Sequence, residues 1–259
     1  MNFVFDLDGT ICFKGVPVTN KILNALEKVQ LRGHNVIFAS ARPIRDMLPV
    51  LDKKFHTYTM IGGNGSLVSR NGNLIHTNSF TDEQVQLIKL IIDQFNATYL
   101  VDGEWDYSYT GPQDHPILKN LDPSKLATKV DFNIHKSIIK ILILTSDNME
   151  GLTEKVAELD VVTNKHGNEN VLDISPQNVH KWNAISRLGI NKGEYIAFGN
   201  DANDITMFMN AKHSVIIGEH KELSKHASEA IPLDEDTEDQ IVEKLEQFLQ
   251  VYEFIENPN

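Results

Sequence analysis

Hydrophobic residues in this chain form short, strand-length runs separated by longer stretches with helical spacing. Residues 3–5 predict a buried strand, and apolar positions repeating every three or four residues between Thr19 and Gly33 predict a helix. Residues 36–39 and 58–61 predict two further strands. Strands that alternate with helices in this way favour a parallel, doubly wound α/β sheet.

The pattern changes after residue 61. Two apolar stretches, 67–68 and 74–76, flank Asn71-Gly72, which is a strong signal for a β-hairpin. The elements expected next are a helix over 81–95, strands over 98–102, 106–110 and 138–145, a helix over 149–159, and strands near 161–163 and 171–174. These elements lack the earlier strict alternation, so residues 82–177 are predicted to form a separate α+β domain.

Alternation returns towards the C-terminus. The expected elements are a helix over 179–188, a strand over 195–198, a short helix, a strand over 214–217 and a long helix over 238–254. One core domain, made of residues 1–81 and 178–259, is therefore predicted to be interrupted by an inserted domain of residues 82–177.

Composition narrows the possible partners and surroundings. A formal net charge of −12 over 259 residues disfavours binding to nucleic acid or to anionic membranes, so neither is expected as a partner. An anionic substrate would need local positive charge at its site. No stretch has the ~18 apolar residues of a membrane-spanning helix, and the absence of a basic and apolar leader pattern before the first strand predicts that there is no signal peptide. A cytoplasmic location is expected, and the single Cys12 suits a reducing compartment better than a disulfide.

Two carboxylates follow the first predicted strand directly. Asp6 and Asp8 stand in the string Asp-Leu-Asp-Gly-Thr, which ends at Thr10. Ligands of open parallel sheets bind at the carboxyl ends of the strands, so two acids at this position can meet one metal ion and one phosphate. An ordinary Asp-Gly turn is the alternative explanation.

This string resembles the first signature of the haloacid dehalogenase (HAD) superfamily, whose members are mostly magnesium-dependent phosphatases. The resemblance implies a second motif at the end of the next strand, where Ser40 stands. Its hydroxyl and the backbone N–H groups of Ala41 and Arg42 would bind phosphate oxygens. The Arg42 side chain would either contact phosphate or brace the loop.

The resemblance also implies a lysine and a second acidic loop. Lys181 fits the third motif, where its ammonium would offset the acid pair and bind a phosphate oxygen. The fourth motif normally reads Gly-Asp-x-x-Asn-Asp, but Asn200 replaces its first acid here. Asn203 is expected to hold the lysine or a phosphate oxygen. The implied Mg²⁺ ligands are Asp6, the Asp8 carbonyl, Asn200 and Asp204, with Asp201 as an alternative.

The segment 61–68, Ile-Gly-Gly-Asn-Gly-Ser-Leu-Val, resembles the turn that precedes the inserted cap in Cof-type sugar-phosphatase-like members. The implied fold is a doubly wound, Rossmann-like α/β core with an inserted α+β cap domain. The implied partner is a small phosphorylated metabolite, either a sugar phosphate or a phosphorylated cofactor such as a pyridoxal or flavin phosphate. Three cap residues are candidates for substrate choice, although core packing also explains the aromatic ones: Trp105, Tyr107 and His115.

The mechanism implied by the resemblance is phosphoester hydrolysis through an aspartyl-phosphate. Asp6 would be the nucleophile, and Asp8 would protonate the leaving alkoxide and then activate water. A phosphotransferase or phosphomutase that passes the phosphoryl group to a second sugar is an alternative. A non-enzymatic phosphometabolite-binding protein, with metal affinity weakened by Asn200, is another. The expected assembly is a monomer or a weak homo-oligomer.

Overall fold

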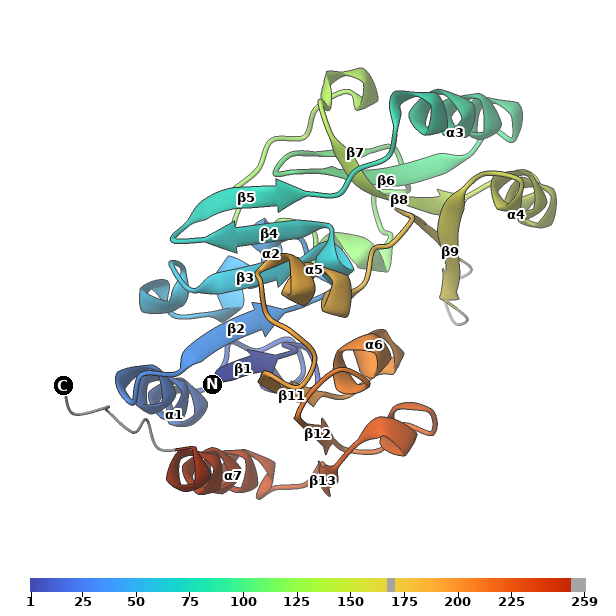
Figure 1. Ribbon diagram of the computed structural model, residues 1–259. Helices are drawn as coiled ribbons and strands as arrows, with labels where there is room; N and C mark the ends of the chain where they lie inside the picture. Colours follow the sequence, from blue (N-terminus) through green and yellow to red (C-terminus); the bar gives the residue numbers. More distant parts are fainter. Residues whose placement is uncertain (167–170, 253–259) are drawn as a thin grey trace.

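The computed structural model describes residues 1–166 and 171–252, and these form two β-sheets with their own helices (Figure 1). The first sheet has the strand order β13-β12-β11-β1-β2-β3-β4-β5. Its strands are β1 (Asn2–Phe5), β2 (Asn35–Ala39), β3 (Thr59–Gly62), β4 (Leu67–Arg70), β5 (Asn73–Thr77), β11 (Tyr195–Gly199), β12 (His213–Ile217) and β13 (Glu229–Ile231). The pairs from β13 through to β3 are all parallel, and β4 and β5 are antiparallel at one side.

Helices cover both faces of this sheet because successive strand residues point to opposite sides. Phe3 and Phe5 pack with α1 (Asn20–Leu31), α2 (Ile44–Met47) and α7 (Thr237–Val251), whereas Val4 packs with α5 (Lys181–Arg187) and α6 (Ile205–Phe208). Figure 1 shows α1 and α7 together on one side of the sheet. The α/β prediction for the core is therefore confirmed.

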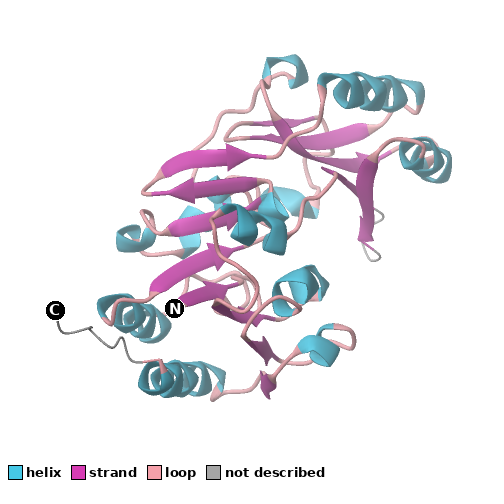
Figure 2. Cartoon of the chain, in the orientation of Figure 1, coloured by secondary structure: helices cyan, strands magenta, loops and turns pink. Residues whose placement is uncertain are grey.

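The second sheet has the order β7-β6-β8-β10-β9 and is antiparallel throughout. Its elements are β6 (Thr98–Gly103), β7 (Tyr107–Tyr109), β8 (Ile138–Thr145), β9 (Val161–His166), β10 (Val171–Pro176), α3 (Asp82–Gln94) and α4 (Met149–Ala157). One face packs against α3 and α4. The other face carries a smaller apolar cluster that includes Leu100 and Leu142. Figure 2 shows the helices of this part on the outer side of the sheet.

Two details of the first sheet extend the sequence analysis. The predicted hairpin is present, and it adds β4 and β5 to the parallel sheet as an antiparallel edge. The strand β13 was not predicted, because it has only three residues and one buried apolar side chain, Ile231. The chain enters the second sheet after β5 and leaves it after β10. Domain boundaries at 82 and 177 remain a prediction.

Cys12 is buried, and burial raises the pKa of its thiol to about 11, so the thiol stays protonated near neutral pH. No helix among the described residues is both long and apolar enough to cross a membrane.

Candidate active site

The predicted acid pair lies at the carboxyl end of β1, with its two members in different environments. The backbone N–H of Asp6 donates to the Phe198 carbonyl at 2.9 Å, which continues the pairing of β1 with β11. The Asp6 side chain is buried, whereas that of Asp8 is 48% exposed. Both acids follow the last residue of β1, Phe5, and Asp8 lies farther along the turn that leads to Thr10.

Lys181 lies fully buried between two carboxylates. Its Nζ donates to Asp6 Oδ1 and to Asp204 Oδ1, each at 2.6 Å. Lys181 is the first residue of α5, and His180 caps that helix by accepting from the Asn183 N–H. The lysine predicted from the third motif therefore meets the first and fourth motifs in one charge cluster.

Burial controls the electrostatics of this cluster. Desolvation raises the pKa of Asp6 to about 7; the Lys181 ammonium opposes this rise and the Asp204 carboxylate adds to it. Burial alone would lower the pKa of Lys181, but the two carboxylates raise it above its ordinary value. Lys181 is therefore charged at neutral pH, and two acids share a single buried cation.

The fourth-motif loop is held by Asp204. While one oxygen of Asp204 binds Lys181, its Oδ2 accepts from the backbone N–H groups of Asn200, at 2.9 Å, and Asp201, at 3.2 Å. Both Asp204 oxygens thus have partners within the protein. The Asp201 side chain points elsewhere, since it accepts from the Ala202 N–H and is 66% exposed.

Asn203 makes no hydrogen bond to Lys181 within the part of the chain that the structure describes. Its Nδ2 donates to Asn64 Oδ1 at 3.1 Å, and its Oδ1 is buried with no hydrogen-bond partner among the described residues. Asn64 in turn donates its backbone N–H to the Ser40 carbonyl at 2.9 Å. The contacts of Asn64 with Asn203 and Ser40 connect the fourth motif with the second. Asn64 belongs to the Gly-Asn-Gly turn, and the sequence analysis did not identify it as a site residue.

The second-motif loop follows β2, and its arginine holds the exposed acid. Ser40 is buried, and its Oγ accepts from the Arg42 N–H at 3.1 Å; Ala41 lies between them, partly buried. Arg42 Nε donates to Asp8 Oδ2 at 2.7 Å, and its Nη1 donates to the Asp46 carbonyl at 3.1 Å. Of the two roles considered for the Arg42 side chain, the structure displays the bracing contact. Phosphate contacts of Ser40, Ala41 and Arg42 remain predictions.

The side-chain oxygen atoms near Asp6 are of the types that Mg²⁺ takes as ligands. The Thr10 hydroxyl lies 3.1 Å from Asp6 Oδ2 and 3.2 Å from Asn200 Oδ1, so one small group contacts both oxygens. A Cβ on Gly9 would lie 2.1 Å from Asn200 Nδ2, so only glycine allows this approach, and its φ of +78° also favours glycine. Carboxylate, carbonyl and amide oxygens are the donors that Mg²⁺ takes.

The amide at position 200 also changes the composition of the site. Across residues 1–166 and 171–252, no group of three or more His, Cys, Asp or Glu side chains is arranged to hold a metal ion. With Asn200 in place of the usual acid, and with Asp8 expected to contribute its backbone carbonyl, the implied donor set contains fewer acids than the family pattern. Thr10, which sequence reasoning left in the turn, is the residue that contacts both Asp6 and Asn200.

A cavity of about 250 Å³ opens between this edge of the core and the second sheet. Asp8, Ala41 and Arg42 line it from the core, and Leu100, Lys140 and Leu142 are among the residues that line it from the second sheet. The three residues proposed for substrate choice are not part of this lining. Trp105 Nε1 donates to the Leu126 carbonyl, Tyr107 lies under Arg45, and His115 caps the turn Pro116–Lys119.

Arg45 joins the two sheets and was not identified from the sequence. It is completely buried, its Nη1 donates to the Trp105 carbonyl at 2.7 Å, and its Nη2 pairs with Asp102. Asp46 lies 3.4 Å from the same guanidinium. The sequence does contain a signal for this role, because the charged residues Arg45 and Asp46 lie between the apolar residues of the four-residue helix α2.

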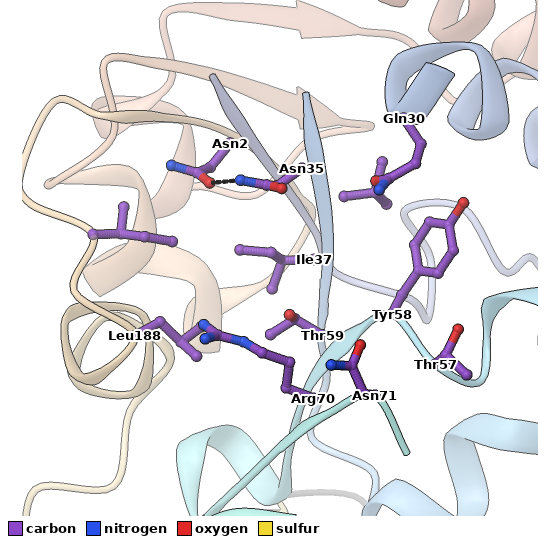
Figure 3. Close-up of a pocket in the computed structure, with 12 residues that line it drawn as sticks. Asn2, Gln30, Asn35, Ile37, Thr57, Tyr58, Thr59, Arg70, Asn71 and Leu188 are labelled. Atoms are coloured by element: carbon purple, nitrogen blue, oxygen red, sulfur yellow. Dashed lines mark hydrogen bonds between the residues drawn. The ribbon is translucent and has the colours of Figure 1, made fainter. Parts of the chain in front are cut away.

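A second, larger cavity of about 580 Å³ lies at the opposite edge of the core sheet, where β1, β2 and β3 begin (Figure 3). Neutral polar side chains dominate its lining, and Asn35 Nδ2 donates there to Asn2 Oδ1 at 2.9 Å. Arg70 is its one charged lining residue. This lining has no acid, lysine, histidine or cysteine, so its threonine and tyrosine hydroxyls have no general base beside them.

Comparison with known proteins identifies relatives over nearly the whole chain. The model of the haloacid dehalogenase-like hydrolase family matches residues 3–245. A Bacillus subtilis protein named "Putative phosphatase YkrA" is 25% identical over 244 residues, which are 90% of this chain and 92% of that protein. The HMP-PP phosphatase of Yersinia enterocolitica is 23% identical over 230 residues, covering 83% of this chain and 82% of that protein.

A solved structure shows the same fold. The HAD subclass IIB sugar phosphatase BT4131 matches with a TM-score of 0.71 and 19% identity, covering 95% of this chain and 98% of that one. The family match confirms the resemblance inferred from the four motifs.

Proposed function

Because the chain belongs to the family of haloacid dehalogenase-like hydrolases and is a phosphatase of that family, we propose that it hydrolyses small phosphomonoesters through an aspartyl-phosphate on Asp6. The observation that carries this proposal is the buried cluster of Asp6, Lys181 and Asp204 at the carboxyl end of β1. A nucleophilic carboxylate next to an anionic phosphate requires fixed positive charge, and Lys181 provides it.

Asp8 is the proposed general acid and base. It lies beside the nucleophile in the sequence but is exposed towards the cavity, where a leaving alkoxide would depart. Arg42 holds its carboxylate in a fixed orientation. In the first step the Asp6 carboxylate forms a bond to phosphorus and the bond to the alkoxide breaks; Asp8, in its protonated form, supplies the proton and becomes the carboxylate that Arg42 binds. In the second step Asp8 removes a proton from the water that attacks phosphorus, and Asp6 is released.

Phosphate oxygens are proposed to bind the Ser40 hydroxyl, the Ala41 N–H and the Lys181 ammonium. Magnesium, when bound, would neutralise phosphate charge. Asp6, the Asp8 carbonyl and Asn200 would hold it. Asp204 is better placed to fix Lys181 and the loop, since both of its oxygens already have partners. Asn203 would position the Ser40 loop through Asn64.

Residues 82–177 are proposed to act as the cap. They form the second sheet, and their inner face lines the cavity opposite Asp8. A covering domain of this kind excludes water from the phosphoryl group and contacts the organic part of the substrate.

Phosphate release from a panel of small phosphomonoesters tests the proposal, with magnesium or with EDTA. Wild type is expected to release phosphate only with magnesium, and Asp6→Asn is expected to lose more than about 10³-fold in kcat. Asp147→Asn is the matched control, because Asp147 is an exposed acid outside the site. Full activity in Asp6→Asn, with contaminating phosphatase excluded, would contradict the mechanism.

A further inference from the structure

The cavity beside Asp8 lies where the organic part of the substrate would be, if the proposed function is correct. Asp8, the proposed acid for the leaving oxygen, lines the cavity, whereas Asp6 and Lys181 are buried outside this lining. The phosphoryl group is therefore assigned to the buried cluster of Asp6 and Lys181, and the leaving group to the cavity. On this assignment, the residues that line the cavity select the leaving group. Its volume of about 250 Å³ is below the 300–1,000 Å³ typical of ligand pockets and suits a single ring.

The wall contributed by the second sheet is largely apolar. Leu100 on β6 is paired across the strands with Leu142 on β8, so the two side chains form one patch. Ile117 and Leu121 extend this patch from the segment after β7, and Pro43 faces it from the core. An apolar ring binds favourably to such a wall, because the apolar surfaces of both are removed from water.

The charged side chains of the lining already have partners of opposite charge within the protein. The pairs are Arg42 with Asp8, Arg45 with Asp102, and Lys140 with Asp173. The third acid of the lining, Asp46, accepts the Asp122 N–H at 3.1 Å and lies 3.4 Å from the Arg45 guanidinium. A substrate hydroxyl in this cavity meets charged groups whose charge is already paired, so each hydrogen bond that it makes there only offsets one that it loses to water.

Among the exposed polar groups of the lining, one is free to bind a substrate; the Arg45 Nε also lacks a partner among the described residues, but that side chain is fully buried. The side-chain amide of Asn120 is exposed and makes no hydrogen bond to another described residue. It can bind one substituent on a ring, but it cannot replace water around the four hydroxyls of a hexose.

From these observations we propose that the preferred substrates are phosphomonoesters of single-ring, largely apolar alcohols, aromatic or alicyclic, with at most one polar substituent. Sugar phosphates would be poor substrates of this chain. The inference deepens the proposed function, since it keeps Asp6 chemistry and specifies the leaving group.

Three primary phosphates that differ only in the ring test this proposal: benzyl phosphate, cyclohexylmethyl phosphate and glucose 6-phosphate. Cyclohexylmethyl phosphate and glucose 6-phosphate have six-membered rings of similar size, but only the sugar carries hydroxyls. We expect kcat/KM for benzyl and cyclohexylmethyl phosphate to exceed that for glucose 6-phosphate by at least about 100-fold.

Two leucines of the same strand provide a matched pair of variants. Leu142 lines the cavity, whereas Leu144, in the same apolar cluster, does not. Leu142→Ala is expected to lower the kcat/KM ratio of cyclohexylmethyl phosphate to glucose 6-phosphate about 5-fold. Leu144→Ala is expected to leave that ratio unchanged. A ratio within one sample is insensitive to the fraction of folded enzyme.

The outcomes separate the inference from the proposed function. Release from glucose 6-phosphate that depends on Asp6 and equals or exceeds release from the other two esters would overturn the inference alone. An absence of Asp6-dependent release from all three esters would contradict both. Equal ratios in Leu142→Ala and wild type would also overturn the inference.

Discussion

The two edges of the core sheet differ in chemistry, and the reactive side chains do not lie at the edge with the larger cavity. The edge where the strands begin has the larger cavity, about 580 Å³, but its lining contains a single charged side chain, Arg70. The edge where the strands end has a cavity of about 250 Å³, yet Asp6, Asp204 and Lys181 are buried beside it. Cavity volume alone would therefore have pointed to the wrong edge.

The difference follows from chain direction in a parallel sheet. Every loop that leaves a parallel strand does so at the same edge, so polar residues from distant segments meet there. Lys181 and Asp6 are 175 residues apart in sequence, and their side chains are 2.6 Å apart. Four predictions test this contrast between the two edges.

The largest effect is expected for Lys181→Met. The substitution leaves Asp6 and Asp204 buried without their cation, so the free energy of unfolding should fall by about 3–5 kcal/mol. Loss of the ammonium should also lower kcat about 10³-fold. Urea unfolding and phosphate release measure the two effects. Lys192 is an exposed lysine just before β11, at the opposite edge of the sheet, and Lys192→Met should change neither the free energy of unfolding nor kcat. Equal losses in the two variants would contradict the proposed difference between the two edges.

Arg45→Met should destabilise the protein by about 3 kcal/mol, because Asp102 and Asp46 would lose a buried partner. Arg70→Met removes the same kind of side chain from the other cavity, where it is exposed, and should change stability by less than about 0.5 kcal/mol. Urea unfolding of both variants compares them. Comparable losses of stability in the two variants would show that structurally important charges are not confined to the edge of the sheet that holds the site.

Asp46→Asn should change how stability depends on pH. Burial raises the pKa of Asp46 to about 6, so the folded protein holds a proton that the unfolded chain releases between about pH 4 and 6. This contribution to stability is present below pH 4 and is lost as the pH rises through 6. Between pH 4 and pH 7 the free energy of unfolding of wild type should fall by about 1–3 kcal/mol more than that of Asp46→Asn. Parallel stability profiles for the two proteins would refute this prediction.

The smallest effect is expected for Asn200→Asp. A carboxylate in place of the amide adds a negative charge next to Asp6, so the dissociation constant for magnesium should fall about tenfold, or about 1.4 kcal/mol. Isothermal titration calorimetry with magnesium measures this change. Asn71→Asp adds the same charge at the opposite edge and should leave the constant unchanged. An unchanged constant in Asn200→Asp would remove Asn200 from the proposed ligand set.

Local patterns predicted most of the fold because each element carries its own signal. The strand at 3–5, the Asn71-Gly72 hairpin and the helical spacing over 81–95 all correspond to observed elements. The meeting of Asp6 and Lys181 could also be predicted, since both follow from motifs at the C-terminal edge of the sheet. The three-residue β13 has too few apolar positions for a pattern.

Contacts between the two sheets could not be predicted from the sequence. The pairing of Arg45 with Asp102 depends on how the two sheets fit together, and the orientation of Arg42 towards Asp8 depends on how two loops of the core sheet fit together. The same applies to the cavity lining, which includes Lys140 and Leu142 but none of the residues that the sequence analysis considered for substrate choice, Trp105, Tyr107 and His115. Aromatic residues suggested recognition, but Trp105 is held by a carbonyl within the cap.

Capture of the covalent intermediate tests the central claim most directly. Wild type mixed with a phosphomonoester and magnesium would be quenched in acid within the first turnover, digested, and examined by mass spectrometry. We expect one phosphoryl group, located on Asp6 and absent from Asp8. Steady release of phosphate with no phosphorylated protein at any quench time, or a phosphoryl group on another residue, would contradict the account.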